Sequence, residues 1–133
     1  SETIGLTQTH EMTLQVVSFG YKHGIPIDAD IVMDVRFLPN PHYAPGLRKF
    51  TGLDEKVQKH ILAQPIARRF LRDWLKLIEE LLPHYVSEGK AYLTLAIGCT
   101  GGRHRSVFCT RWLAQSLRSS GHPIQEFHRD ISL

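Results

Sequence analysis

The sequence predicts an α/β fold, a layered sandwich with a mostly parallel central sheet. Strand-like segments alternate with helical segments along the chain, which is typical of this class. An apolar run at 92–97 breaks into a glycine-rich loop and then into a helical pattern, as at the ligand-binding turn of a parallel sheet. The length of 133 residues, with 42% hydrophobic and 22% charged residues, suits one soluble domain. We expect a linker or flexible arm over residues 1–11 and a single domain over 12–133.

Four segments have the composition of strands. Residues 12–20 alternate apolar and polar side chains before they end in glycine, and residues 31–37 alternate in the same way. Residues 91–97 form a continuous apolar run, which is typical of a buried central strand. Residues 124–128 follow a glycine and a proline and predict a last, short strand.

Three segments have the spacing of helices. A short amphipathic helix is predicted after the start signal at 51–54 and before Pro65. A longer helix is predicted over 70–82, where apolar residues recur every three or four positions, and Pro83 is expected to interrupt the chain after it. The last helix is predicted over about 104–119. Helices separate the second strand from the third and the third from the fourth, so these strands are expected to run parallel.

The loop over 98–106 has the composition of an anion site. Its glycines allow a sharp turn and a close backbone approach to a ligand. The following helix presents free amide groups and the positive end of its dipole, and Arg103, His104 and Arg105 add positive charge. We therefore expect phosphate or a phosphorylated molecule to bind there.

Other polar residues follow the predicted strands and converge on this loop if the sheet is parallel. Three prolines restrain the loop over 38–46 and hold its polar side chains at low entropic cost. The predicted ligand-binding residues are Lys22, His23, Asp34, Arg36, Asn40, His42, Gly98, Cys99, Thr100, Gly101, Gly102, Arg103, His104, Arg105 and Ser106. For Asp34, pairing with Arg36 is the alternative to a role in the site.

The same loop also matches the pattern of cysteine, two residues, glycine, two residues, arginine and serine of protein tyrosine phosphatases. In that chemistry a thiolate, here Cys99, attacks phosphorus while Arg105 holds the phosphoryl oxygens, and Asp34 is a candidate acid by position. The alternative is that Cys99 is a small, semi-buried residue while the glycines and Arg105 bind an anion. We favour binding without catalysis.

Composition limits the other function classes. Two cysteines are too few for a zinc site of their own, and no metal or cofactor is expected. The formal charge of +3 permits contact with nucleic acid. No apolar run is long enough to span a membrane and no signal-peptide pattern precedes the domain, so we expect a cytoplasmic protein. The charged form of His104 is expected to be disfavoured by its two arginine neighbours, and Arg111 is expected to be solvated or ion-paired.

Three blocks, 18–26, 34–42 and 98–107, together resemble the C-terminal domain of the RapZ (YvcJ-like) family. The resemblance implies a domain similar to the ligand-binding part of phosphofructokinase. It also implies a non-enzymatic adapter that senses an amino-sugar phosphate such as glucosamine-6-phosphate. Enterobacterial members bind small RNA and present it to a ribonuclease, and we expect a homo-oligomer without a membrane partner. Family members usually carry a P-loop nucleotide-binding domain as well, but no Walker motif is present in this chain.

Overall fold

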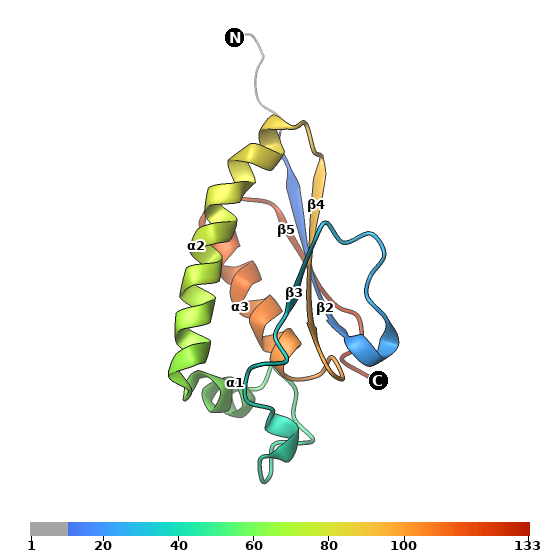
Figure 1. Cartoon of the computed structure of the whole chain (residues 1–133), viewed down its shortest axis with the longest axis vertical. Coiled ribbons are helices and arrows are strands. Elements are labelled where there is room, and N and C mark those ends of the chain that lie inside the picture. The colour runs from blue at the N-terminus through green and yellow to red at the C-terminus, as the bar shows by residue number, and fades with distance from the viewer. Residues whose placement is uncertain (1–10) are drawn as a thin grey trace.

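The computed structural model describes residues 11–133, which form a four-stranded sheet with helices packed on one face (Figure 1). The strands are β2 (Thr13–Gly20), β3 (Ile31–Asp34), β4 (Tyr92–Cys99) and β5 (Ile124–His128), in the order β3-β4-β2-β5. The helices are α1 (Glu55–Leu62), α2 (Pro65–Ser87) and α3 (Arg105–Ser119), and the loops contain two 3₁₀ turns, η1 (Tyr21–His23) and η2 (Pro41–Tyr43). All strand pairings are parallel, which confirms the predicted α/β fold. The predicted arm over 1–11 lies outside the described residues, apart from Glu11.

The central strands explain the apolar run in the sequence. All residues of β4 except Tyr92 are buried, because β4 lies between β2 and β3 and is covered by helices on one face. Leu93 and Leu95 pack in the core beside Leu14 and Val16 of β2. Complete burial of an aliphatic side chain of this size contributes about 1.5–3 kcal/mol, so these pairs anchor the sheet to the helices.

The two faces of the sheet are covered differently. Helices α2 and α3 lie on one face, whereas the connection from β2 to β3, residues 21–30, runs over the other (Figure 1). The connection from β4 to β5 passes through α3 on the helical face. The chain crosses the sheet in one direction from β2 to β3 and in the opposite direction from β4 to β5. Since crossovers between parallel strands are right-handed, the two connections lie on opposite faces. The carboxyl ends of the strands therefore share one edge of the sheet.

Strand β3 is shorter than the sequence predicts, so the expectation of a strand over 31–37 is wrong for its second half. The Asp34 carboxylate accepts a hydrogen bond from Arg36 N at 2.9 Å. Leu38 N then donates to the Val35 carbonyl at 3.1 Å and closes a turn. A short polar side chain that captures a nearby backbone amide competes with strand pairing in this way. Phe37 consequently lies 52% exposed instead of continuing an inward-facing row.

Helix α2 is longer than predicted, because it continues through Pro83 to Ser87. The helix begins at Pro65, a first-turn position where the missing amide of proline costs nothing. Near its other end, Tyr85 and Val86 still pack against the core. Packing on both sides of Pro83 offsets the lost backbone hydrogen bond, so the local helix-breaking signal is overridden. No helix in residues 11–133 combines the length and the hydropathy needed to cross a membrane.

Candidate functional site

The strand–loop–helix turn between β4 and α3 is built on close backbone packing. Gly98 is paired in register with Phe19, and a Cβ atom at Gly98 would lie 2.4 Å from the Phe19 ring. Gly102 has φ +85°, a left-handed conformation that glycine adopts without strain. A Cβ atom there would lie 2.6 Å from Gly20 N and 2.9 Å from Asp130 Cβ. The loop therefore rests on the carboxyl ends of two other strands.

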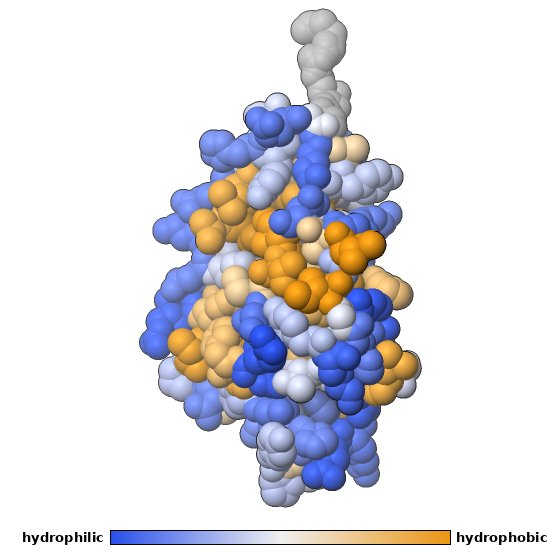
Figure 2. Space-filling view, turned by 45° about the vertical axis from the view of Figure 1, so that its right-hand side comes forward, coloured by the Kyte–Doolittle hydropathy of each residue, from blue (hydrophilic) through white to orange (hydrophobic). Residues whose placement is uncertain are grey.

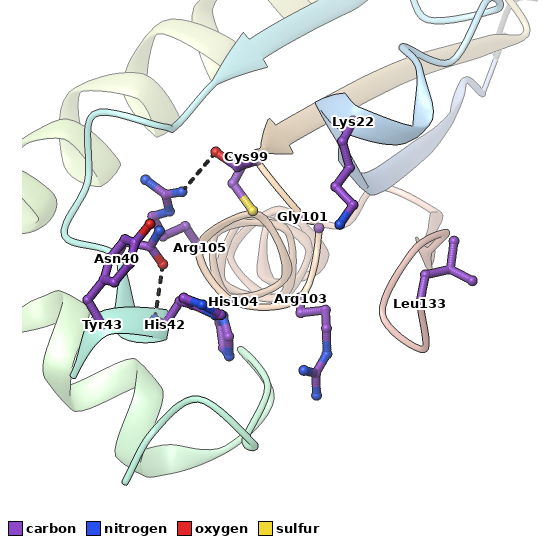
Figure 3. Close-up of a pocket in the computed structure, with 12 residues that line it drawn as sticks. Lys22, Asn40, His42, Tyr43, Cys99, Gly101, Arg103, His104, Arg105 and Leu133 are labelled. Carbon is purple, nitrogen blue, oxygen red and sulfur yellow. Dashed lines mark hydrogen bonds between the residues drawn. The ribbon is translucent and has the colours of Figure 1, made fainter. Parts of the chain in front are cut away.

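A pocket of about 320 Å³ opens over this loop (Figure 3). Cys99 projects into it from the end of β4, Arg105 lies on the same side as Asn40 and Tyr43, and Lys22 approaches from the opposite side (Figure 3). No acidic side chain is among the described residues that line it, so the pocket is cationic. Its lining residues are Lys22, Asn40, His42, Tyr43, Cys99, Thr100, Gly101, Gly102, Arg103, His104, Arg105 and Leu133.

Arg105 is the buried cation of the pocket. Its side chain is held by backbone carbonyls, because Nη1 donates to the carbonyl oxygen of Arg36 at 2.6 Å and to that of Leu38 at 3.2 Å. Nη2 donates to Thr100 Oγ1 at 3.4 Å. Arg105 is only 5% exposed, forms no ion pair within residues 11–133, and its Nε has no hydrogen-bond partner there. A buried guanidinium that forms no ion pair is an electrostatic site for an anion.

Lys22 and Arg103 differ in how they meet the pocket. The Lys22 backbone is fixed by a hydrogen bond from its amide to the Thr100 carbonyl at 3.2 Å, and its amine approaches Gly101 (Figure 3). Arg103 points away from the centre and donates to the carbonyl oxygens of Ile131 at 3.3 Å and Lys49 at 3.4 Å. Lys22 can therefore reach a bound anion, whereas Arg103 mainly ties the loop to neighbouring segments.

His104 precedes the first turn of α3 and is 7% exposed. Its Nε2 lies 3.2 Å from the Arg48 carbonyl oxygen. Burial lowers the pKa of His104, and the charge of Arg103 lowers it further, although backbone hydrogen bonds oppose both effects. The lowered pKa agrees with the sequence prediction that the charged form of His104 is disfavoured. Burial contributes more to this shift than the neighbouring positive charges on which the prediction rested. The ring is thus neutral near pH 7.

The thiol of Cys99 donates to Ser106 Oγ at 3.1 Å in the buried first turn of α3. Cys99 is 3% exposed and lines the floor of the pocket. Cys109, one turn further along the buried face of α3, is fully buried, and burial raises the pKa of its thiol strongly. Both cysteines are free thiols.

The other predicted residues lie apart from the pocket lining. Asp34 and Arg36 form a bidentate pair at the surface, with Arg36 Nη2 2.7 Å from Asp34 Oδ2. The pKa of the Asp34 carboxyl is lowered, first by its hydrogen bonds with Arg36. The Arg36 guanidinium also stacks 3.9 Å from the centre of the Tyr21 ring. His23, Gly98 and Ser106 likewise do not line the cavity, although Ser106 reaches it through Cys99.

Asn40 and His42 reach the pocket from the proline-rich loop. Asn40 begins η2, where its Oδ1 accepts a hydrogen bond from His42 N at 3.0 Å. The sequence prediction missed Tyr43, although it is the next residue of the same 3₁₀ turn, and it missed Leu133. Only the path of the chain after β5 brings Leu133 to the pocket, so no local signal could have found it.

Asp130 supports the loop without lining the pocket. Its buried carboxylate accepts a hydrogen bond from Gly20 N at 2.8 Å and pairs with Arg129 Nη2 at 2.8 Å. The Asp130 side chain also packs against Gly102.

Arg111 forms an ion pair with Glu126 at 2.7 Å, which is one of the two states, solvated or ion-paired, that the sequence predicted for it. No group of three potential metal ligands occurs within residues 11–133.

An all-parallel sheet with a cationic strand–loop–helix pocket at its carboxyl edge places the chain in the α/β class of domains. Residues 12–132 match the family model of the RapZ C-terminal domain, and the chain belongs to this family. The resemblance found in the sequence is thereby confirmed.

Curated relatives carry the name nucleotide-binding protein. One from Moorella thermoacetica is 48% identical over 98% of this chain and 44% of its own length. One from Desulforudis audaxviator is 51% identical over 96% of this chain and 43% of its own length. A third, from Lactobacillus gasseri, is 50% identical over 98% and 45%, respectively. The chain thus spans less than half the length of these relatives.

Proposed function

We propose that this domain is a non-enzymatic sensing adapter that binds an amino-sugar phosphate, such as glucosamine-6-phosphate, in the pocket over the β4–α3 loop. The observation that carries the proposal is Arg105, a buried guanidinium that forms no ion pair among residues 11–133 and whose Nε has no hydrogen-bond partner there. The phosphate would take the position between the loop amides, Arg105 and Lys22. Anionic groups are favoured at a helix N-terminus for the same electrostatic reason.

The size and chemistry of the rest of the pocket support a sugar phosphate over a bare anion. A cavity of about 320 Å³ exceeds the volume that a phosphate group requires and lies in the range of small-molecule sites. Asn40, Tyr43 and Thr100 add polar groups to the lining that can hydrogen-bond sugar hydroxyls. The basic groups alone would not discriminate between phosphorylated ligands.

Calorimetry tests this proposal with glucosamine-6-phosphate, glucose-6-phosphate, glucosamine and inorganic phosphate. We expect glucosamine-6-phosphate to bind most tightly and glucosamine to give no signal. Lys22→Met removes an exposed lysine of the pocket and should weaken binding about tenfold, the effect of one charge-assisted hydrogen bond. Lys76→Met, which removes an exposed lysine on α2, is the matched control. Absence of heat with all four compounds, or equal affinities for wild type and Lys22→Met, would oppose the proposal.

We also propose that this adapter domain binds RNA and presents the bound RNA to a ribonuclease. Support comes from the resemblance to RNA-binding family members and from the positive charge of the pocket, which Lys22, Arg103 and Arg105 line. Binding through phosphates releases counterions, so affinity for a stem-loop RNA should fall steeply with salt. Fluorescence anisotropy between 50 and 200 mM salt measures this slope. A flat response would contradict an electrostatic RNA contact.

The alternative is a cysteine-dependent phosphatase, and the hydrogen bond from Cys99 to Ser106 is the observation in its favour. In this reaction the Cys99 thiolate would attack phosphorus, the alcohol would leave with a proton, and water would hydrolyse the phosphocysteine. One feature favours binding instead. Asp34, the candidate acid, is paired with Arg36 and lies outside the pocket lining, so it is not placed to protonate a leaving group.

The two functions are separated by a p-nitrophenyl phosphate assay on wild type and Cys99→Ser. The sensing proposal predicts no turnover in either protein and retained binding of glucosamine-6-phosphate in the variant. Turnover that Cys99→Ser abolishes would favour the phosphatase.

A further inference from the structure

The connection from β2 to β3 carries Lys22 but is not held by the core. None of residues 21–30, all of which the structure describes, is buried, and Ile25 and Ile27 are 50% and 102% exposed. Figure 2, in which the side of the molecule that carries this connection is turned forward, shows hydrophobic side chains exposed across the middle of the surface. The contacts at the start of the connection therefore determine where Lys22 lies.

The ring of Tyr21 makes the main contacts of η1, the first turn of this connection. It meets the Phe19 ring edge to face, with 4.8 Å between the ring centres. A Cβ atom at Gly98 would lie 2.7 Å from the Tyr21 ring, so the glycine on β4 leaves room for it. The Arg36 guanidinium lies over the ring, 3.9 Å from its centre. The Tyr21 ring thus contacts β2, β4 and the segment after β3.

Arg36 is linked to both sides of the anion pocket. Its backbone carbonyl oxygen accepts the hydrogen bond of 2.6 Å from Arg105 Nη1. Its side chain stacks on Tyr21, the residue before Lys22 in η1. The bidentate pair with Asp34, in which Arg36 Nη2 lies 2.7 Å from Oδ2, orients the guanidinium for this stacking. One residue therefore connects the buried cation of the pocket to the turn that carries the exposed cation.

We propose that the stacking of Arg36 on Tyr21 positions Lys22 for contact with the bound anion. Neither residue lines the pocket, so both act through Lys22, whose amine approaches Gly101 (Figure 3). The Lys22 amide donates to the Thr100 carbonyl at 3.2 Å. A lysine side chain reaches a ligand at lower entropic cost when its backbone is already fixed. This role rests on the proposed function, because it concerns the same anion.

The charge of Arg36 could also attract an anion through space, and variants of matched charge separate this effect from positioning. Tyr21→Leu removes the ring without a change of charge, and Tyr21→Phe keeps the ring as its conservative control. Asp34→Asn/Arg36→Gln removes the ion pair and keeps the net charge. Arg72→Gln/Asp73→Asn removes another exposed pair, at 3.1 Å on α2, and is the matched control.

The first measurement needs no ligand. Hydrogen exchange of the Lys22 amide, followed by NMR, reports how firmly η1 is held against the Thr100 carbonyl. We expect exchange to be about threefold faster, the scale of a lost cation–π contact, in Tyr21→Leu and in Asp34→Asn/Arg36→Gln. Tyr21→Phe and the α2 control should exchange as wild type does, and slow amides of β4 check that each variant is folded. Unchanged exchange in Tyr21→Leu would overturn the inference.

The second measurement is a double-mutant cycle with inorganic phosphate, followed by calorimetry. Tyr21→Leu should raise the Kd about threefold, which is less than the effect of Lys22→Met, because a positioning residue contributes no more than the group that it positions. In the Lys22→Met background Tyr21→Leu should have no effect. An equal effect of Tyr21→Leu in both backgrounds would also overturn the inference. A wild-type chain that binds no phosphate would contradict the proposed function, whereas exchange of the Lys22 amide would still decide whether the stacking holds this residue.

Discussion

The guanidinium of Arg105 donates a hydrogen bond of 2.6 Å to the backbone carbonyl oxygen of Arg36 and so joins the first turn of α3 to the segment after β3. The same nitrogen also reaches the Leu38 carbonyl at 3.2 Å. These contacts span more than sixty residues of sequence. They make one side chain responsible both for the shape of the pocket wall and for its positive charge.

Replacing Arg105 by alanine should therefore destabilise the fold as well as the site. A buried carbonyl oxygen, that of Leu38, and a partly buried one, that of Arg36, would lose their donor, and we expect the free energy of unfolding to fall by about 3 kcal/mol. Urea denaturation measures this change. Arg103→Ala is the matched control, because its hydrogen bonds at 3.3 and 3.4 Å are longer and closer to the surface, and it should cost less than about 1 kcal/mol. Equal losses in the two variants would contradict the structural role of Arg105.

Anions should stabilise the wild-type protein. A phosphate that binds the folded chain and not the unfolded chain adds RT ln(1 + [L]/Kd), about 2.7 kcal/mol at a hundredfold excess over Kd. We expect sodium phosphate to raise the melting temperature above that in sodium chloride of equal ionic strength. In Lys22→Met the increase should be smaller at the same phosphate concentration. An identical shift in both proteins would show that Lys22 does not contact the anion.

The glycines of the loop should respond unequally to substitution. Gly102→Ala places a methyl group against Gly20 and Asp130 at a φ of +85°, so we expect a loss of more than about 2 kcal/mol and impaired phosphate binding. Gly101→Ala meets no atom within 4 Å and should cost less than about 1 kcal/mol. Thermal and urea unfolding compare the two variants. Similar stabilities would contradict the packing described for Gly102.

Periodicity in the sequence was sufficient to predict the parallel sheet and the helices, because each element buries a face whose spacing is visible locally. Periodicity did not predict the ends of those elements that are determined by a single side chain or by packing against residues distant in the sequence. Asp34 ends β3 by capturing the amide of Arg36, and packing around Tyr85 carries α2 through Pro83. Both effects depend on contacts that no hydrophobic pattern records.

The residues of the pocket were likewise predicted only in part. The loop over 98–105 is contiguous, so its chemistry could be read directly, and the carboxyl-edge rule brought Lys22, Asn40 and His42 to it. The rule predicts where the carboxyl ends of the strands lie, but it does not predict the direction in which each side chain points. For that reason it also selected Arg36, which turns toward Asp34 and Tyr21 instead of the cavity.

Asp130 makes stability depend on acid pH. Burial opposes ionisation of this carboxyl, but hydrogen bonds from Arg129 and from Gly20 N outweigh it, and the pKa of Asp130 is lowered. In the unfolded chain the pKa of an aspartate is about 3.9. Around and below that pH the unfolded chain therefore binds more protons than the folded chain. The stabilisation is therefore complete above about pH 5 and is lost as the pH falls through the unfolded pKa towards the lowered folded pKa.

Asp130→Asn should accordingly lower the free energy of unfolding at pH 7, and the difference from wild type should shrink as the pH falls from 5 to 2. The variant keeps an oxygen that can accept from Gly20 N but loses the charge that pairs with Arg129. Urea denaturation at a series of pH values measures both curves, and Asp28→Asn, at an exposed position, is the control. Wild-type and Asp130→Asn curves that remain parallel down to pH 2 would show that the Asp130 charge does not hold β2 against the loop. A converging pair would make Asp130 the residue through which the chain after β5 fixes the backbone of Gly20, on which Gly102 and the pocket floor rest.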